Sequence, residues 1–212
     1  MPNEVPLQEI ILLEESAVTM EQNGGTTEYD SVSAAIDATQ AYNKDTNKGL
    51  YTITLNENLA EDVVIPEGRY IKIDLNGHTL NGGTGTAKAA ILNKGNVTIT
   101  DTSAGKTGTI KRDDQGAQGE ISYYVIDNNG TMVIDQANVI NNSGSKGSSL
   151  IRNGGVDTVS SLTINGGTLT SKQAVVQNWN KAQILGGNLT GGYLWTDSYT
   201  EAGTVGETVI GG

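Results

Sequence analysis

A three-residue pattern recurs along the chain, and each copy ends in a polar residue at the same position. The copies are Ile91-Leu92-Asn93, Ile126-Asp127-Asn128, Ile151-Arg152-Asn153, Val176-Gln177-Asn178 and Trp195-Thr196-Asp197. In each copy an apolar residue comes first and an amide or carboxylate comes third. Recurrence of this kind is typical of a solenoid, in which each unit buries its apolar face only by stacking on its neighbours.

Two further apolar positions follow each copy. The first is occupied by Ile99, Ile134, Ile164 and Ile184, and the second by Ile110, Val139, Leu169 and Leu189. Each unit therefore contains three short strands, separated by Gly- and Asn-rich turns. The pattern predicts an all-β fold: a right-handed single-stranded parallel β-helix with three strands per coil and about five to six coils.

Alternation along the first strand predicts its register. If Ile126 and Ile151 point inward, Asp127 and Arg152 point outward, and a slip of one residue would bury both charges. The polar column then lies inside the coil, where each amide bonds its neighbour and the nearby turn. We expect a structural ladder of Asn93, Asn128, Asn153, Asn178 and Asp197, which ends at Asp197 because a carboxylate cannot donate a hydrogen bond.

The two ends of the chain differ from its middle. Residues 1–28 predict a polar leader and residues 29–212 a single β-helix domain, with coils over 51–212. An apolar stripe predicts a helix over 29–43 that caps the N-terminal end of the core; it consists of Val32, Ala35, Ile36, Thr39 and Tyr42. Residues 207–210 match a second strand with no third, which predicts homo-oligomers or further domains through that end.

One pair of phrases resembles a known family. Over about residues 30–212 the chain resembles β-helix modules of the pectin-lyase-like superfamily in surface proteins of gut Firmicutes. The segments that carry the resemblance are Val63-Val64-Ile65-Pro66-Glu67-Gly68 and Asp74-Leu75-Asn76-Gly77-His78-Thr79-Leu80-Asn81-Gly82. The resemblance implies a fold that hosts polysaccharide lyases, glycoside hydrolases, adhesins and phage fibre domains. It implies no catalytic role for the residues of these phrases.

Charge and composition exclude several classes of partner and chemistry. Lys and Arg number 13 against 24 Asp and Glu, and a net charge of −11 repels phosphate backbones and anionic lipid. The chain has no cysteine, which excludes thiol chemistry and disulfides. No apolar stretch is long enough for a membrane span, and no signal peptide is visible.

An enzyme on this scaffold needs outward carboxylates on adjacent coils and a base. Asp101 and Asp135 are candidates, but Asn165 and Leu185 follow them, so the row loses its charge. His78 is the only histidine and lies among turn residues. The sequence therefore predicts no catalytic residue, metal or cofactor, and a polysaccharide lyase or hydrolase is the least favoured alternative.

The longest insertions all leave one edge of the coil. The distance from the third strand to the next unit is 16 residues after Ile110 and 12 after Val139, but shorter later. Binding functions accumulate on such loops. We expect Trp179 to face outward, where its ring can stack on a sugar, and Tyr193 and Trp195 to plug the last coil. The predicted ligand surface is Lys111, Arg112, Asp113, Asp114, Tyr123, Asn141, Lys146 and Trp179.

These patterns favour a non-catalytic binding or structural module outside a bacterial cytoplasm. It would act on the cell surface as an adhesin for a glycan or protein ligand, or as a spacer between domains. The alternative is a virion component, either a fibre or a capsid decoration, which the initial Met1 and the missing signal favour.

Overall fold

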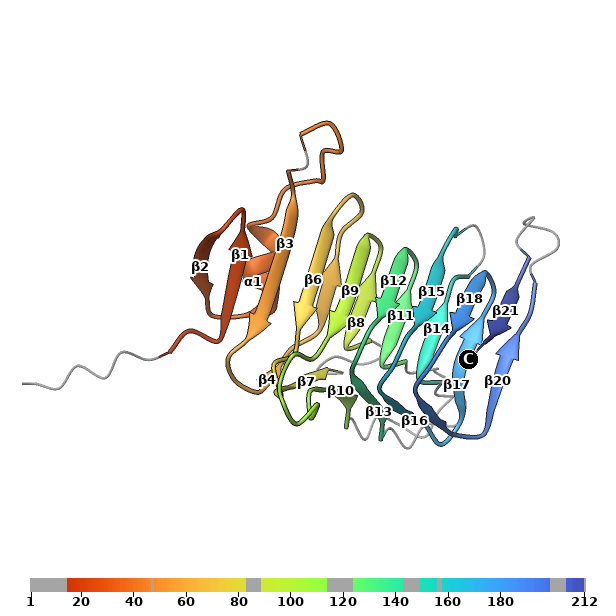
Figure 1. The fold of residues 1–212 in the computed structure, drawn as a ribbon. Helices are drawn as coiled ribbons and strands as arrows, with labels where there is room; N and C mark the ends of the chain where they lie inside the picture. Colours follow the sequence, from red (N-terminus) through yellow and green to blue (C-terminus); the bar gives the residue numbers. More distant parts are fainter. Residues whose placement is uncertain are drawn as a thin grey trace, which may run out of the picture.

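Three sheets run side by side along the molecule in the computed structural model (Figure 1). The structure describes residues 15–46, 48–82, 89–113, 124–142, 149–155, 158–198 and 205–211. Sheet I has the order β2 (Gly25–Tyr29), β1 (Val18–Gln22), β3 (Leu50–Leu55), β6 (Tyr70–Asp74), β9 (Asn96–Thr100), β12 (Thr131–Ile134), β15 (Ser161–Ile164), β18 (Lys181–Ile184) and β21 (Glu207–Ile210).

The other two sheets contain six strands each. Sheet II contains β4 (Leu59–Ala60), β7 (Thr79–Gly82), β10 (Thr109–Arg112), β13 (Asn138–Asn141), β16 (Thr168–Thr170) and β19 (Asn188–Thr190). Sheet III contains β5 (Val63–Ile65), β8 (Ile91–Asn93), β11 (Ile126–Asn128), β14 (Ile151–Asn153), β17 (Ala174–Asn178) and β20 (Tyr193–Thr196).

The chain visits the three sheets in turn, so every third strand returns to the same sheet. From β3 to β20 the described strands make six coils, and β21 begins another turn in sheet I. Neighbouring coils pair in parallel throughout. The predicted parallel β-helix, with its three strands per coil, is confirmed.

The predicted register is confirmed as well. Ile126 pairs with Ile91 on one side and with Ile151 on the other, and all three side chains are fully buried. Arg152 and Asp127 point outward and form an ion pair, in which Arg152 Nε donates to Asp127 Oδ1 at 2.8 Å. The inward residues of all three sheets form one continuous apolar cluster, so the interior is a stack of side chains without separate compartments.

The asparagine ladder is present over four coils. Each Nδ2 donates to the Oδ1 of the next asparagine at 2.7 Å, in the order Asn93, Asn128, Asn153, Asn178. Each of the first three also donates to a strand carbonyl of the adjacent coil, at 2.9 to 3.0 Å. The ladder therefore satisfies buried polar groups of both the side chains and the backbone in the turns between sheets III and I.

The ladder does not extend to Asp197, and that prediction is wrong. Thr196, not Asp197, pairs with Asn178, because a bulge in β17 shifts the register of β20 by one residue. Asp197 is exposed and accepts a hydrogen bond from the backbone of Ser198. The same shift turns Trp195 outward, opposite Gln177, and Tyr193 is 53% exposed, so neither aromatic ring plugs the coil as predicted.

The described N-terminal part of the chain contains a hairpin within the predicted polar leader. Strand β1 pairs in antiparallel fashion with both β2 and β3, and its turn contains Asn23 and Gly24 at positive φ. Val18 and Met20 are buried, because the short strand alternates apolar and polar residues. The leader prediction is wrong over residues 18–28, and residues 1–14 lie outside the described part of the chain.

One short helix lies beside the first strands. Helix α1 covers Val32–Asp37, and is therefore shorter than the predicted 29–43. Its N-cap is Ser31, and the Glu61 carboxylate accepts hydrogen bonds from the backbone of Val32 and Ser33 at 2.8 and 3.1 Å. The helix contacts β1, β2, β3 and β5, and its apolar side chains join the common core. Among the described residues, no helix is long and apolar enough to cross a membrane.

Candidate functional site

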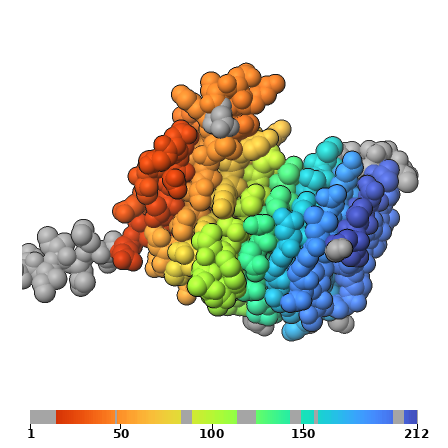
Figure 2. Space-filling model, viewed as in Figure 1, coloured from red at the N-terminus to blue at the C-terminus, as the bar shows by residue number. Residues whose placement is uncertain are grey.

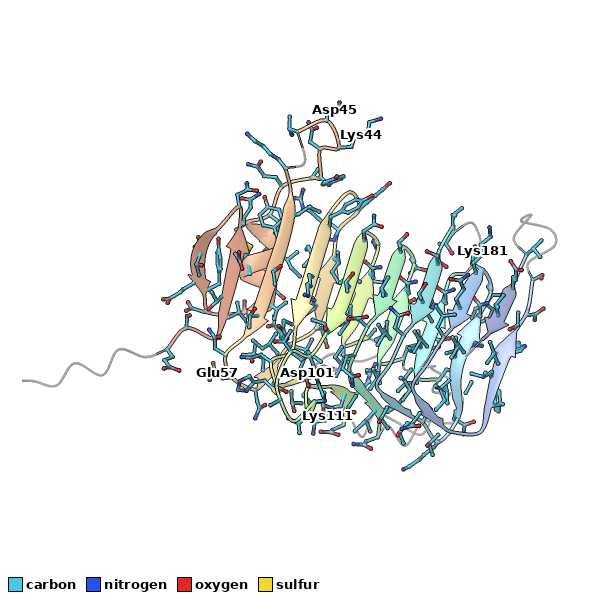
Figure 3. All side chains as sticks on the ribbon, in the orientation of Figure 1. Lys44, Asp45, Glu57, Asp101, Lys111 and Lys181 are labelled. Carbon is cyan, nitrogen blue, oxygen red and sulfur yellow. The ribbon has the colours of Figure 1, made fainter. Side chains whose placement is uncertain are left out.

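The predicted ligand surface does not form one patch. Asp114, Tyr123 and Lys146 lie outside the described residues. Lys111 and Asp113 do lie on the outer side of sheet II, where their side chains form an ion pair at 2.5 Å; Figure 3 labels Lys111 there. Asn142 Nδ2 also donates to Asp113 Oδ1 at 2.7 Å. Hydrogen bonds from Lys111 and Asn142 lower the pKa of Asp113, so this carboxylate is already bound by neighbouring side chains.

Arg112 and Asn141 point into the molecule, and their assignment to the ligand surface is wrong. Both follow the inward alternation of their strands, and they face each other across β10 and β13. Arg112 is fully buried and donates to the carbonyl of Tyr124 at 3.4 Å, while Asn141 donates to the carbonyl of Ser149 at 3.1 Å. Each side chain thus ties together the two ends of one insertion.

Trp179 is also buried, with 7% of its surface exposed, so the prediction that its ring is open to a sugar is wrong. Its ring packs edge-on against Trp195, with 5.3 Å between ring centroids. Because Trp195 points outward from the last strand of sheet III, it covers Trp179. The pair therefore presents one ring to solvent, that of Trp195, which is 40% exposed.

Asp101, one of the two candidate carboxylates of an enzyme, is a buried turn residue. It accepts hydrogen bonds from the backbone N–H groups of Gly77, Ser103 and Gly108 at 2.9, 3.0 and 2.6 Å. Burial alone would raise the pKa of Asp101, but these bonds outweigh it and leave the pKa below its usual value. Asp135 aligns with Thr100 instead of Asp101, so the two carboxylates do not form a row.

Metal binding has no support in the part of the chain that the structure describes. There, no three His, Cys, Asp or Glu side chains gather closely enough to hold a metal ion.

A groove with a volume of about 480 Å³ lies on the outer face of sheet I. It crosses β1, β3, β6, β9 and β12, which stand side by side in Figure 1. We call it the sheet I groove. Its lining residues are Glu21, Gln22, Asn23, Leu50, Tyr51, Thr52, Tyr70, Ile71, Lys72, Asn96, Val97, Thr98, Thr131 and Val133.

The floor of the groove consists of outward side chains in two rows. Parallel pairing stacks Leu50, Tyr70, Asn96 and Thr131 in one row. The second row is Thr52, Lys72, Thr98 and Val133. Leu50 and Tyr70 are 45% and 37% exposed, so the first row is apolar on the first two coils and presents Asn96 and Thr131 on the next two.

Tyr70 is held by a second aromatic ring. The ring centroids of Tyr70 and Tyr42 are 4.3 Å apart and their planes are inclined by 31°. Tyr42 is anchored in turn, because its backbone N–H donates to the carbonyl of Gly68 at 2.9 Å. Of these two rings, only that of Tyr70 lines the groove, so Tyr42 supports Tyr70 from outside the groove.

A projecting loop begins directly after Tyr42. Asn43 and Lys48 form an isolated bridge at its base, and Asn43 Oδ1 accepts hydrogen bonds from the backbone of Asp45 and Thr46. Figure 2 shows the loop as the orange projection above the solenoid, and Figure 3 labels Lys44 and Asp45 at its tip. The hydrogen bonds at its base fix the segment that leads from Tyr42 back to β3.

The predicted ligand surface does not include this groove. The signal is the position of Leu50 and Tyr70, each one residue before a buried residue of its strand and therefore outward. The two residues become neighbours only when β3 and β6 are set in register. The coils differ in length, so a fixed repeat length does not give that register.

Comparisons with known proteins give no relative for this chain: no protein-family model, curated protein or solved structure matches it.

Proposed function

We propose that this chain is a non-catalytic binding module that holds an extended polymer on the outer face of sheet I. The sheet I groove carries the proposal, because it crosses five neighbouring strands on a rigid scaffold. An elongated groove on a regular sheet suits a chain-like ligand better than a compact one, and a preformed surface needs little reorganisation to bind.

The ionisable groups support binding over catalysis. The groove lining contains one carboxylate, Glu21, whereas glycoside hydrolysis ordinarily uses a pair. Outside the groove, Asp101 and Asp113 are occupied by backbone and side-chain donors. Neither has the raised pKa that a general acid needs at neutral pH.

The absence of cysteine from the chain gives a direct test. A single cysteine is introduced by Thr98→Cys in the groove, and a control cysteine by Thr168→Cys on sheet II. Each is labelled with an environment-sensitive fluorophore. The probes are uncharged, acidic and basic polysaccharides and extended peptides. We expect a saturable change for one class of probe with the Thr98→Cys protein only, and no shortening of the polymer by size-exclusion chromatography.

Two results would contradict the proposal. If no class of polymer changes the Thr98→Cys signal selectively, the groove is not a binding site. If the bound polymer is shortened over time, the module is an enzyme.

A further inference from the structure

The sheet I groove repeats the same outward positions once per coil. Neighbouring strands in a sheet lie about 4.7–4.9 Å apart, so the five strands of the groove span about 19 Å along the solenoid axis. A ligand that runs along this axis meets equivalent positions at that interval. Its own repeat must match the strand spacing if successive units are to make similar contacts.

This spacing separates two classes of polymer. An extended polypeptide advances about 3.3 Å per residue, so its side chains fall out of step with the coils. A pyranose unit in an extended glycan advances by a length close to the strand spacing. A glycan along the axis therefore places one sugar over each coil.

The charge of the groove narrows the class further. Among the residues that line it, Glu21 and Lys72 are the ionisable groups of opposite charge, and Thr52, Asn96, Thr98 and Thr131 supply neutral donors and acceptors. The chain as a whole carries −11, which disfavours an acidic polymer. Neutral hydroxyl and amide groups suit a ligand that offers hydroxyl groups of its own.

Tyr70 adds an aromatic platform on β6, the middle one of the five strands that the groove crosses. An aromatic ring is apolar on its face and tolerates polar groups at its edge, as does a sugar ring. Because Tyr42 packs on it at 4.3 Å, Tyr70 loses little freedom when a ligand stacks on it. Leu50, its neighbour in β3, extends the apolar surface.

We propose that the ligand of the sheet I groove is an uncharged polysaccharide, which lies along the solenoid axis with one sugar per coil and stacks on Tyr70. Tyr42 is a positioning residue that holds the Tyr70 ring. This inference rests on the proposed binding function and names the class of polymer.

The first test uses defined oligosaccharides from xylan, mannan and β-glucan in calorimetric titrations with the whole chain. We expect affinity to rise with chain length up to about four or five sugars and then to level, because the groove crosses four coils and the adjacent hairpin strand β1. Binding should change little between low and high salt. Acidic polygalacturonate should bind more weakly than the uncharged chains. Basic chitosan is attracted by the net negative charge, so its binding should be lost at high salt.

The second test compares tyrosine variants on the ligand that binds best. We expect Tyr70→Ala to weaken binding about tenfold and Tyr70→Phe to keep it, because the phenylalanine ring can stack in the same way. Tyr42→Ala should have an intermediate effect. Tyr193→Ala should have none, because Tyr193 lies on sheet III; it is 53% exposed, against 37% for Tyr70. Circular dichroism checks that each variant is folded.

The outcomes distinguish this inference from the proposed function. If only peptides or charged polymers change the Thr98→Cys signal, the groove binds a ligand but the assignment to an uncharged glycan is wrong. Equal affinities for Tyr70→Ala and Tyr193→Ala would also contradict the assignment. If no polymer of any class binds, both proposals fail.

Discussion

Removal of one amide from the middle of the asparagine ladder should destabilise the whole solenoid. Asn128 donates to Asn153 Oδ1 and to the carbonyl of Ser161, and accepts from Asn93 Nδ2 and the backbone of Gly130. The side chain is fully buried, so water does not replace these partners. With about 1 kcal/mol for each lost bond, we expect Asn128→Ala to cost roughly 3–5 kcal/mol of unfolding free energy.

The matched control is Asn165→Ala. Asn165 is exposed and makes one side-chain hydrogen bond, to Asp135 at 3.2 Å, so its removal should cost less than about 0.5 kcal/mol. Thermal unfolding by circular dichroism measures both variants. For a domain of this size, 1 kcal/mol shifts the midpoint by roughly 2–4 °C, which predicts a drop of about 6–20 °C for Asn128→Ala.

A second variant at the same position tests the hydrogen-bond argument itself. In Asn128→Asp the carboxylate cannot donate, so its oxygens face the acceptors that Asn128 served. Its pKa in the folded state should therefore rise above the unfolded value. The penalty should be full near neutral pH and should fall as the pH drops through the raised pKa. Equal stability of Asn128→Ala and Asn165→Ala, or a pH-independent penalty, would refute the reasoning.

Three other substitutions follow from single contacts. Folding lowers the pKa of Asp101, so its carboxylate stabilises the fold above about pH 4, and this stabilisation declines as the pH falls toward the folded pKa. Asp101→Asn should therefore be less stable at pH 7, and its unfolding free energy in urea titrations should fall less steeply as the pH is lowered. Because Arg112 is buried, Arg112→Ala should lower the midpoint of thermal unfolding but leave polymer binding, measured with the Thr98→Cys reporter, unchanged. Altered binding would show that Arg112 does belong to the ligand surface. Gly167→Ala should cost more than about 2 kcal/mol, because φ is +94° and the new Cβ would lie 1.9 Å from a backbone oxygen; Gly25→Ala, with 3.5 Å of clearance, is the control.

The sequence by itself determined the repeat, the three strands of each coil and the ladder. These features depend on local alternation and on polar residues at matched positions, and both can be read directly when every coil obeys the same rule. The same alternation predicts that Arg112 points inward, because it lies two residues after the buried Ile110. A charged residue at the end of a strand resembles the start of a loop, which is why the predicted ligand surface includes Arg112.

Only the tertiary structure decided the rest. Thr196 replaces Asp197 opposite Asn178 because a bulge changes the pairing of β20, and no local pattern marks it. Trp179 is buried because Trp195, in the next strand of sheet III, covers it. The groove depends on which outward residues lie side by side, and that follows from pairing between coils of unequal length. Sequence fixes the direction of each side chain along a strand, whereas its neighbours on the surface depend on how the coils stack.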